Sequence, residues 1–316
     1  MTVTEKKYRA KVVLLVCSAF LGLTGCFTGI ESTPKITSKE LKKQDVTEIT
    51  EKRFLDGIDQ QAPSLWRPGK KFYIADNRAS RGAWRVEPAY VSDSLEGAIA
   101  VLSVVDTAST LTDSVEVRLL FTIPQKNAVM EFRTGKTMNQ WNNLNSFTLP
   151  HLIDMDVVDA VSSRLIGKTF YILPARRTGA NSNDTIGTRY QPVRIIDVSP
   201  ATESTPLRVA FVDNENHVAS LLMTVGDAGA SRRSFETLFA LDNPRQRYKQ
   251  ITDDFWEKII HGKICLGMTP DECRLALGAP DSRLSIPTTA GMVDRWNYTD
   301  GVYIIFEDGV VASFRQ

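Results

Sequence analysis

Histidines with nearby carboxylates are the side chains of this chain best suited to acid–base or metal chemistry, and they are few. The 316 residues include three histidines, His151, His217 and His261. Because Asp154 and Asp156 follow His151, an imidazole and two carboxylates could meet in an acid–base pair or a metal site. At a predicted helix start, however, Asp154 is better explained as an N-terminal cap. We therefore predict no catalytic or metal site at the histidines.

Other chemistry-bearing patterns are incomplete. Gly135-Lys136-Thr137 is similar to the end of a phosphate-binding loop, but Met130 stands where that loop needs a glycine. No Gly-x-Ser-x-Gly turn is present to hold a nucleophilic serine. The pairs Arg176-Arg177 and Arg232-Arg233 could bind an anion, although we expect them in solvated loops. The sequence thus predicts no catalytic residues and no cofactor.

The cysteines allow one covalent link. Of four cysteines, Cys17 and Cys26 lie near the N-terminus, which leaves Cys265 and Cys273 for the folded part. In an oxidising compartment these two could form a disulfide. We favour the alternative, in which both are small buried hydrophobic side chains.

The N-terminus has the layout of an export signal. Four basic side chains lie within residues 6–11, an apolar run follows over Val12–Leu23, and small residues lead to Cys26. The run is shorter than the roughly 20 residues that a transmembrane helix needs. We therefore predict a signal peptide at residues 1–25.

The four residues Leu23-Thr24-Gly25-Cys26 resemble the lipobox of bacterial lipoproteins. In that family the cysteine thiol receives a diacylglycerol, the signal is cut before it, and the new N-terminus is acylated. The resemblance implies lipidation at Cys26 and anchoring to a membrane through these chains. Since no run of acidic residues follows the cysteine, we expect the outer membrane and a periplasm-facing protein. An ordinary secretory signal ending near a cysteine is the alternative.

Charge argues against a nucleic-acid partner. Removing residues 1–25 takes away four basic side chains and one acidic one, so the net charge changes from +1 to about −2. Nucleic-acid-binding proteins normally carry a basic surplus. We expect no nucleic acid and no polybasic membrane patch.

A polar segment and a weak internal repeat follow. Residues 26–59 are expected to be a tether. Gly69–Ile74 then recurs as Gly167–Ile172, 98 positions later. Each copy leads through a polar loop to an Arg-containing strand that reaches a proline, Trp84–Pro88 in the first and Arg189–Pro192 in the second.

Two further strand-like runs follow in each half: Ala98–Val105 and Val115–Ile123 in the first, and Leu207–Val212 and Val218–Val225 in the second. The fold class expected is mainly β with α+β: two tandem β-rich repeats, small barrels or sandwiches, at residues 60–150 and 151–245. Leu149–Ile166 is predicted to hold a helix before the second repeat.

Residues 246–316 predict a separate α+β module. Thr252 can cap one helix, and Thr269-Pro270-Asp271-Glu272 is a capping box that starts a second. Three strands joined through Asp-Gly turns finish the chain, over Val293–Tyr298, Val302–Phe306 and Val310–Phe314. The expected core includes six side chains: Trp256, Ile260, Leu277, Trp296, Tyr303 and Phe306.

Four short motifs in this module resemble the SmpA/OmlA (BamE-like) family. They are Gly262–Thr269, Leu277-Gly278-Ala279-Pro280, Trp296-Asn297-Tyr298 and Phe306–Gly309. The resemblance covers about the last 65 residues and implies two helices on an antiparallel sheet, in envelope lipoproteins that hold other proteins. The whole chain is also similar to large lipoproteins of Bacteroidota.

The expected function is therefore a membrane-anchored, non-enzymatic envelope lipoprotein that binds protein partners. Val302–Phe306 makes both sheet faces apolar, so the free face either packs on the β-rich repeats, which we favour, or is a docking surface. The alternative is an envelope hydrolase or glycan-binding lipoprotein whose site lies in the repeats. Exposure of Trp66, Trp84 and Trp141 would support it.

Overall fold

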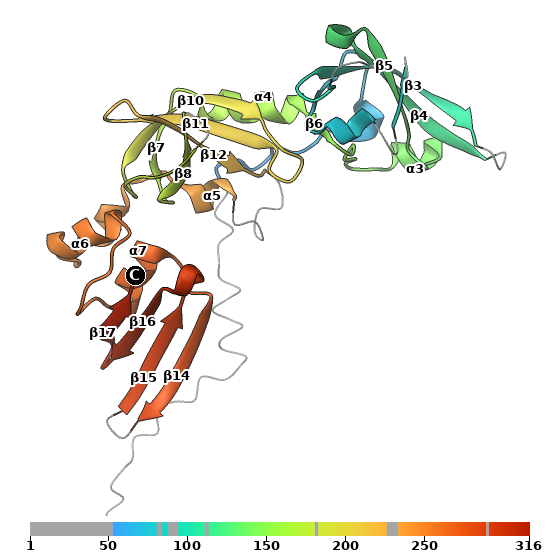
Figure 1. Ribbon diagram of the computed structural model, residues 1–316. Coiled ribbons are helices and arrows are strands. Elements are labelled where there is room, and N and C mark those ends of the chain that lie inside the picture. Colours follow the sequence, from blue (N-terminus) through green and yellow to red (C-terminus); the bar gives the residue numbers. More distant parts are fainter. Residues whose placement is uncertain are drawn as a thin grey trace, which may run out of the picture. The chain divides into compact units, whose positions relative to one another are not determined.

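The computed structural model describes residues 53–80, 84–87, 94–110, 114–180, 183–225, 233–288 and 291–316 (Figure 1). Residues 1–51 form one unit, which lies outside the described residues, and Lys52–Gln316 form the other. Cys26 and the signal peptide therefore lie outside the described residues. The described part is mainly β, with three antiparallel sheets that we name A, B and C. None of its helices combines the length and apolar character needed to span a bilayer.

Sheet A has the strand order β2-β5-β4-β3-β1-β6. Its strands are β1 (Lys71–Ile74), β2 (Trp84–Glu87), β3 (Ile99–Ser109), β4 (Val115–Ile123), β5 (Ala128–Arg133) and β6 (Leu152–Asp154). The short helices η1 (Pro63–Leu65), η2 (Asn77–Ser80), η3 (Pro124–Lys126) and α3 (Met138–Asn142) join them. Phe72, Phe121, Trp66 and Trp141 are among the side chains of its core.

Sheet B has the order β13-β7-β10-β11-β12-β8-β9. Its strands are β7 (Thr169–Ile172), β8 (Arg176–Gly179), β9 (Asp184–Ile186), β10 (Pro192–Pro200), β11 (Leu207–Asp213), β12 (Val218–Met223) and β13 (Phe239–Ala240). Helices α4 (Met155–Leu165) and α5 (Phe235–Leu238) accompany it, and η4 (Pro244–Arg247) follows. Val158, Val161 and Leu165 on α4 lie in its core, so the helix predicted within Leu149–Ile166 is confirmed.

Two predicted boundaries and one predicted strand correspondence differ from the structure. Residues 53–59 are not tether: Leu55 and Ile58 are buried in the core of sheet B, because aromatic packing holds the segment, with the Phe54 ring 4.8 Å from that of Phe235. The division at 150/151 fails because β6 pairs with β1. The predicted match between Trp84–Glu87 and Arg189–Pro192 also fails. Trp84–Glu87 forms β2, which pairs with β5 at one edge of sheet A. Residues 189–192 instead lead into β10, which pairs with β7.

Sheet C has the order β14-β15-β16-β17 beside helices α6 (Asp253–Ile260) and α7 (Pro270–Leu277). Its strands are β14 (Ser282–Thr288), β15 (Gly291–Asn297), β16 (Tyr303–Glu307) and β17 (Val310–Arg315), with η5 (Thr299–Gly301) between β15 and β16. Both predicted helices and the Thr269–Glu272 capping box are confirmed. The prediction of three strands is wrong, because β14 pairs with β15 along its whole length.

The predicted core of this module is confirmed in part. Trp296 and Phe306 are buried with ring centroids 4.8 Å apart. The other four predicted core residues, Trp256, Ile260, Leu277 and Tyr303, are only half-buried. Tyr303 is half-exposed because strand alternation places it on the face opposite Ile304 and Phe306, which are 0% and 2% exposed.

Candidate binding sites

The three histidines lie in separate places and do not meet one another. His151 Nδ1 is 2.9 Å from Glu203 Oε2, not on Asp154 or Asp156. His217 lies 3.4 Å from Asp213 at a hairpin turn, and His261 contacts Glu257 one helical turn away. The described residues contain no group of three or more His, Cys, Asp or Glu side chains that could hold a metal ion.

The two C-terminal cysteines are free thiols, so the candidate disulfide is not formed in the structure. Cys273 is buried, and burial raises its thiol pKa to about 12. Burial also raises the pKa of the half-buried Cys265. Since the thiolate is the reactive form, burial disfavours reaction at both cysteines.

The tryptophans that would support glycan binding are buried. Trp66, Trp84 and Trp141 are 3%, 5% and 1% exposed, and each packs against other aromatic rings of sheet A. A sugar ring cannot stack on them while this core is intact. The exposed aromatic surface that would support the alternative function is therefore not present at these three residues.

Arg177 is not in a solvated loop, contrary to the prediction. It lies in β8 and is 5% exposed, because its guanidinium packs 5.7 Å from the Phe211 ring centroid and donates to the carbonyl of Thr188. Burial lowers its pKa, and its Nε is buried without a hydrogen-bond partner among the described residues. Arg232 lies outside the described residues.

Lys70, the second residue of the first repeated hexapeptide, forms a buried ion pair. Its Nζ is 2.8 Å from Asp154 Oδ1 and also contacts Asp156 at the start of α4. Asp154 caps α4 as predicted, accepting from the Asp156 N–H at 3.0 Å. Burial raises the Asp154 pKa, which the Lys70 contact opposes. Sequence reasoning missed this pair because 84 positions separate its members.

A cavity of about 650 Å³ lies beside this ion pair, a volume typical of small-molecule sites. Apolar side chains from β6, α4, β11 and the end of β12 line it, together with polar groups from residues 59–60 and 145–148. Asp59, Asp154 and Glu203 are the charged residues of the described lining. Sequence reasoning found Asp154 only as a helix cap and did not single out Glu203.

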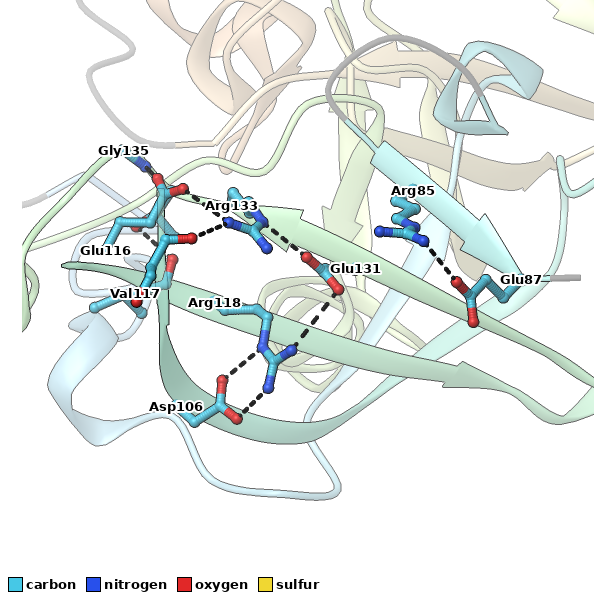
Figure 2. Close-up of polar contacts among 11 residues, drawn as sticks. Arg85, Glu87, Asp106, Glu116, Val117, Arg118, Glu131, Arg133 and Gly135 are labelled. Carbon is cyan, nitrogen blue, oxygen red and sulfur yellow. Dashed lines mark hydrogen bonds and ion pairs between the residues drawn. The ribbon is translucent and has the colours of Figure 1, made fainter. Parts of the chain in front are cut away.

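Alternating charges cover part of one face of sheet A (Figure 2). Arg118 contacts both carboxylate oxygens of Asp106 and lies 4.0 Å from Glu131. Arg133 lies between two glutamates: its Nε is 2.9 Å from Glu131 Oε1, and its Nη1 is 3.6 Å from Glu116 Oε1. The Arg118 contact lowers the Asp106 pKa. Each charge faces an opposite one, so the cluster is a solvated sheet surface rather than a ligand site.

The face of sheet C opposite Ile304 and Phe306 carries exposed apolar side chains among polar ones. On β14, Leu284 and Ile286 are 53% and 41% exposed. Arg295 separates Leu284 from Ile305 across the strands, and its guanidinium lies 4.7 Å from the Tyr303 ring centroid. Solvent reaches Leu284 and Ile286, whereas Tyr303 and Ile305, the residues on which the prediction of packing against the β-rich repeats was based, are half-buried.

Comparison with known proteins adds no neighbour: no family model, no curated protein and no solved structure matches the chain.

Proposed function

We propose that the protein is a lipid-anchored lipoprotein of the bacterial cell envelope that acts without catalysis, by binding other envelope proteins. The exposed apolar face of sheet C carries this proposal. Leu284 and Ile286 on β14 share this face with Ile305 on β16, and Arg295 stands between Leu284 and Ile305. Exposed apolar patches of this kind are typical of protein-binding sites. The resemblance of this module to BamE-like domains supports the same function.

The anchor is the lipid on Cys26, with the signal at residues 1–25 removed and the protein held at the outer membrane, facing the periplasm. The Leu-Thr-Gly-Cys sequence supports this placement. Cys26→Ala is expected to release the chain from membrane fractions, and intact-mass analysis of the wild type is expected to show acyl chains. Unchanged membrane partitioning of Cys26→Ala would contradict the anchor.

Partner binding is tested by glutamate substitutions on the two faces of β16. Ile305→Glu is expected to fold and to lose crosslinked envelope partners, because Ile305 is half-exposed on the apolar face. Ile304→Glu is expected to unfold the module, because Ile304 is fully buried. Val129→Glu, at an exposed apolar residue of sheet A, is the matched control and should keep its partners. If Ile305→Glu folds and retains every crosslink, this surface is not the binding site.

We also propose that sheets A and B are two copies of one unit. Listed from the β9 end, sheet B without β9 runs β8-β12-β11-β10-β7-β13, which parallels β2-β5-β4-β3-β1-β6 strand for strand. Irregular positions support the match: a β-bulge follows Leu102 in β3 and Ile195 in β10. Asn127 and Asn216 both have left-handed backbones, Asn127 in the turn before β5 and Asn216 in the turn before β12. An experimental structure with unrelated strand pairing at residues 69–74 and 167–172 would contradict the duplication.

A further inference from the structure

The cavity beside the Lys70–Asp154 pair has a charge pattern that selects a kind of ligand. We propose that it binds an alkylammonium compound, a primary amine in its charged form with a short hydrocarbon body. The proposal goes beyond protein binding by sheet C and does not rest on it.

The apolar part of the lining suits the hydrocarbon body. Leu152, Val157, Val158, Leu207 and Val225 all line the cavity. An aliphatic chain placed among them is removed from water, which favours binding in proportion to the apolar surface buried. A strongly polar ligand would lose this contribution.

The charged part of the lining suits an ammonium group. Asp59, Asp154 and Glu203 line the cavity, and the described lining contains no lysine or arginine. Behind the lining, Lys70 brings one positive charge against the two carboxylates of Asp154 and Asp156. Arg78 also interacts with Glu203, but its charge is paired with Asp76. The surroundings are therefore net negative, which favours a cation and disfavours a carboxylate or phosphate.

The Asp154 carboxylate has unused hydrogen-bonding capacity. Asp154 is 5% exposed, and its Oδ2 is buried with no hydrogen-bond partner among the described residues. Glu203 Oε2 lies 2.9 Å from His151 Nδ1, but that nitrogen has no hydrogen-bond partner among the described residues. An ammonium group carries three N–H donors and accepts nothing, so it matches carboxylate oxygens of this kind.

His151, whose Nδ1 lies 2.9 Å from Glu203 Oε2, has a left-handed backbone with φ +64°. Histidine adopts this region more often than most residues other than glycine. The His151 carbonyl accepts from the Ala75 N–H at 2.9 Å, which fixes the backbone at this position.

The test measures binding of three matched probes to the full chain by methyl NMR at Val157 and Leu207. n-Butylammonium should produce saturable shifts, at least about tenfold tighter than n-butanol, and butyrate should produce none. Equal shifts with n-butylammonium and n-butanol, or binding of butyrate, would overturn the proposal. A further probe is lysine whose α-amine is acetylated and whose carboxylate is amidated, so that only the ε-ammonium is charged. If it binds more tightly than n-butylammonium, the source of the amine is a peptide lysine. If it binds more weakly, the source is a free amine.

Substitutions tie binding to the cavity. Glu203→Gln should weaken n-butylammonium binding about tenfold, whereas Glu215→Gln, at another hairpin glutamate beside a histidine, should leave it unchanged. Asp59→Asn, at an exposed lining residue, gives a second variant should Glu203→Gln fail to fold. Unchanged affinity in the folded variants would exclude this cavity as the amine site.

Discussion

Sheets A and B share strand order, bulge position and turn conformation, yet they differ at several corresponding positions. Phe121 and Phe211 each face the residue before the bulge. The ring of Trp84 lies 5.6 Å from Phe121, whereas the guanidinium of Arg177 lies 5.7 Å from Phe211. One backbone arrangement therefore accommodates either an indole or a buried cation. The pairing of the strands, not the identity of this core side chain, defines the arrangement.

A second difference concerns a left-handed position just before β3 in sheet A and just before β10 in sheet B. Gly97 has φ +86° and its N–H donates to Ile74, while Tyr190 has φ +58° and its N–H donates to Ile172. The tyrosine gains compensating contacts, because its hydroxyl donates to the Leu275 carbonyl at 2.8 Å and its ring lies 5.4 Å from Trp256. The position of Tyr190 in sheet B therefore contacts α6 and α7, whereas the corresponding position of Gly97 in sheet A only forms a turn.

The largest contrast is expected at the position of Trp84 and Arg177. Trp84→Ala should lower the free energy of unfolding by about 3–5 kcal/mol, because it empties a buried aromatic site. Arg177→Met should leave that free energy nearly unchanged or raise it by about 1 kcal/mol, since it removes a buried charge without a carboxylate contact among the described residues. Urea denaturation of the purified chain measures both. A large loss with Arg177→Met would show that its guanidinium is stabilising.

The repeated lysines provide the next contrast. Lys70→Ala should cost about 3–5 kcal/mol, because it leaves the buried Asp154 without its counter-charge. Lys168→Ala should change the free energy of unfolding by no more than about 0.5 kcal/mol, because Lys168 is exposed. Hydrogen exchange in β1 and β7 would localise the effects. Similar losses in the two variants would contradict the distinction between them.

Substitutions at Gly97 and Tyr190, the two residues with left-handed backbones, should change the free energy of unfolding by smaller amounts and for different reasons. Gly97→Ala should cost about 1–2 kcal/mol from backbone strain alone, because no atom lies within 4 Å of the added Cβ. Tyr190→Phe keeps the backbone and the ring and should cost about 1 kcal/mol for the lost hydroxyl contact. Thermal denaturation with hydrogen exchange in α7 tests this. Only Tyr190→Phe should alter protection there.

The smallest effect is expected on the charged face of sheet A. Arg118 lowers the Asp106 pKa, so the stabilisation from Asp106 is present above its ordinary value near 3.8 and is lost as pH falls through the lowered value. The stability difference between wild type and Asp106→Asn should therefore narrow below about pH 4. In sheet B, Ser199 faces Arg208 at the corresponding position. Ser199→Asp should stabilise the protein by about 0.2–1 kcal/mol near neutral pH, as a cross-strand opposite-charge pair does.

Features that depend on residues close in sequence could be predicted well. The Thr269–Glu272 capping box, the Thr252 cap and the Asp308-Gly309 turn all formed as expected, because each needs contacts only three or four positions apart. The export signal and lipobox are equally local, and they stay predictions. Strand β14 was missed because it contains Pro287, and a proline within a run argues against a strand inside a sheet. The structure tolerates it because β14 lies at the edge of sheet C.

The sequence by itself determined the helix starts and hairpin turns, the mainly β class and the recurrence of the hexapeptide. Only the tertiary structure decided which strands pair across long separations, and thus that β6 belongs to sheet A and that Arg177 is buried. It also decided that Lys70 meets Asp154 and that Glu203 lines a cavity with Asp59. Such contacts join residues that are distant in sequence, and no local pattern of hydrophobicity, capping or turn residues specifies which distant partner a side chain meets.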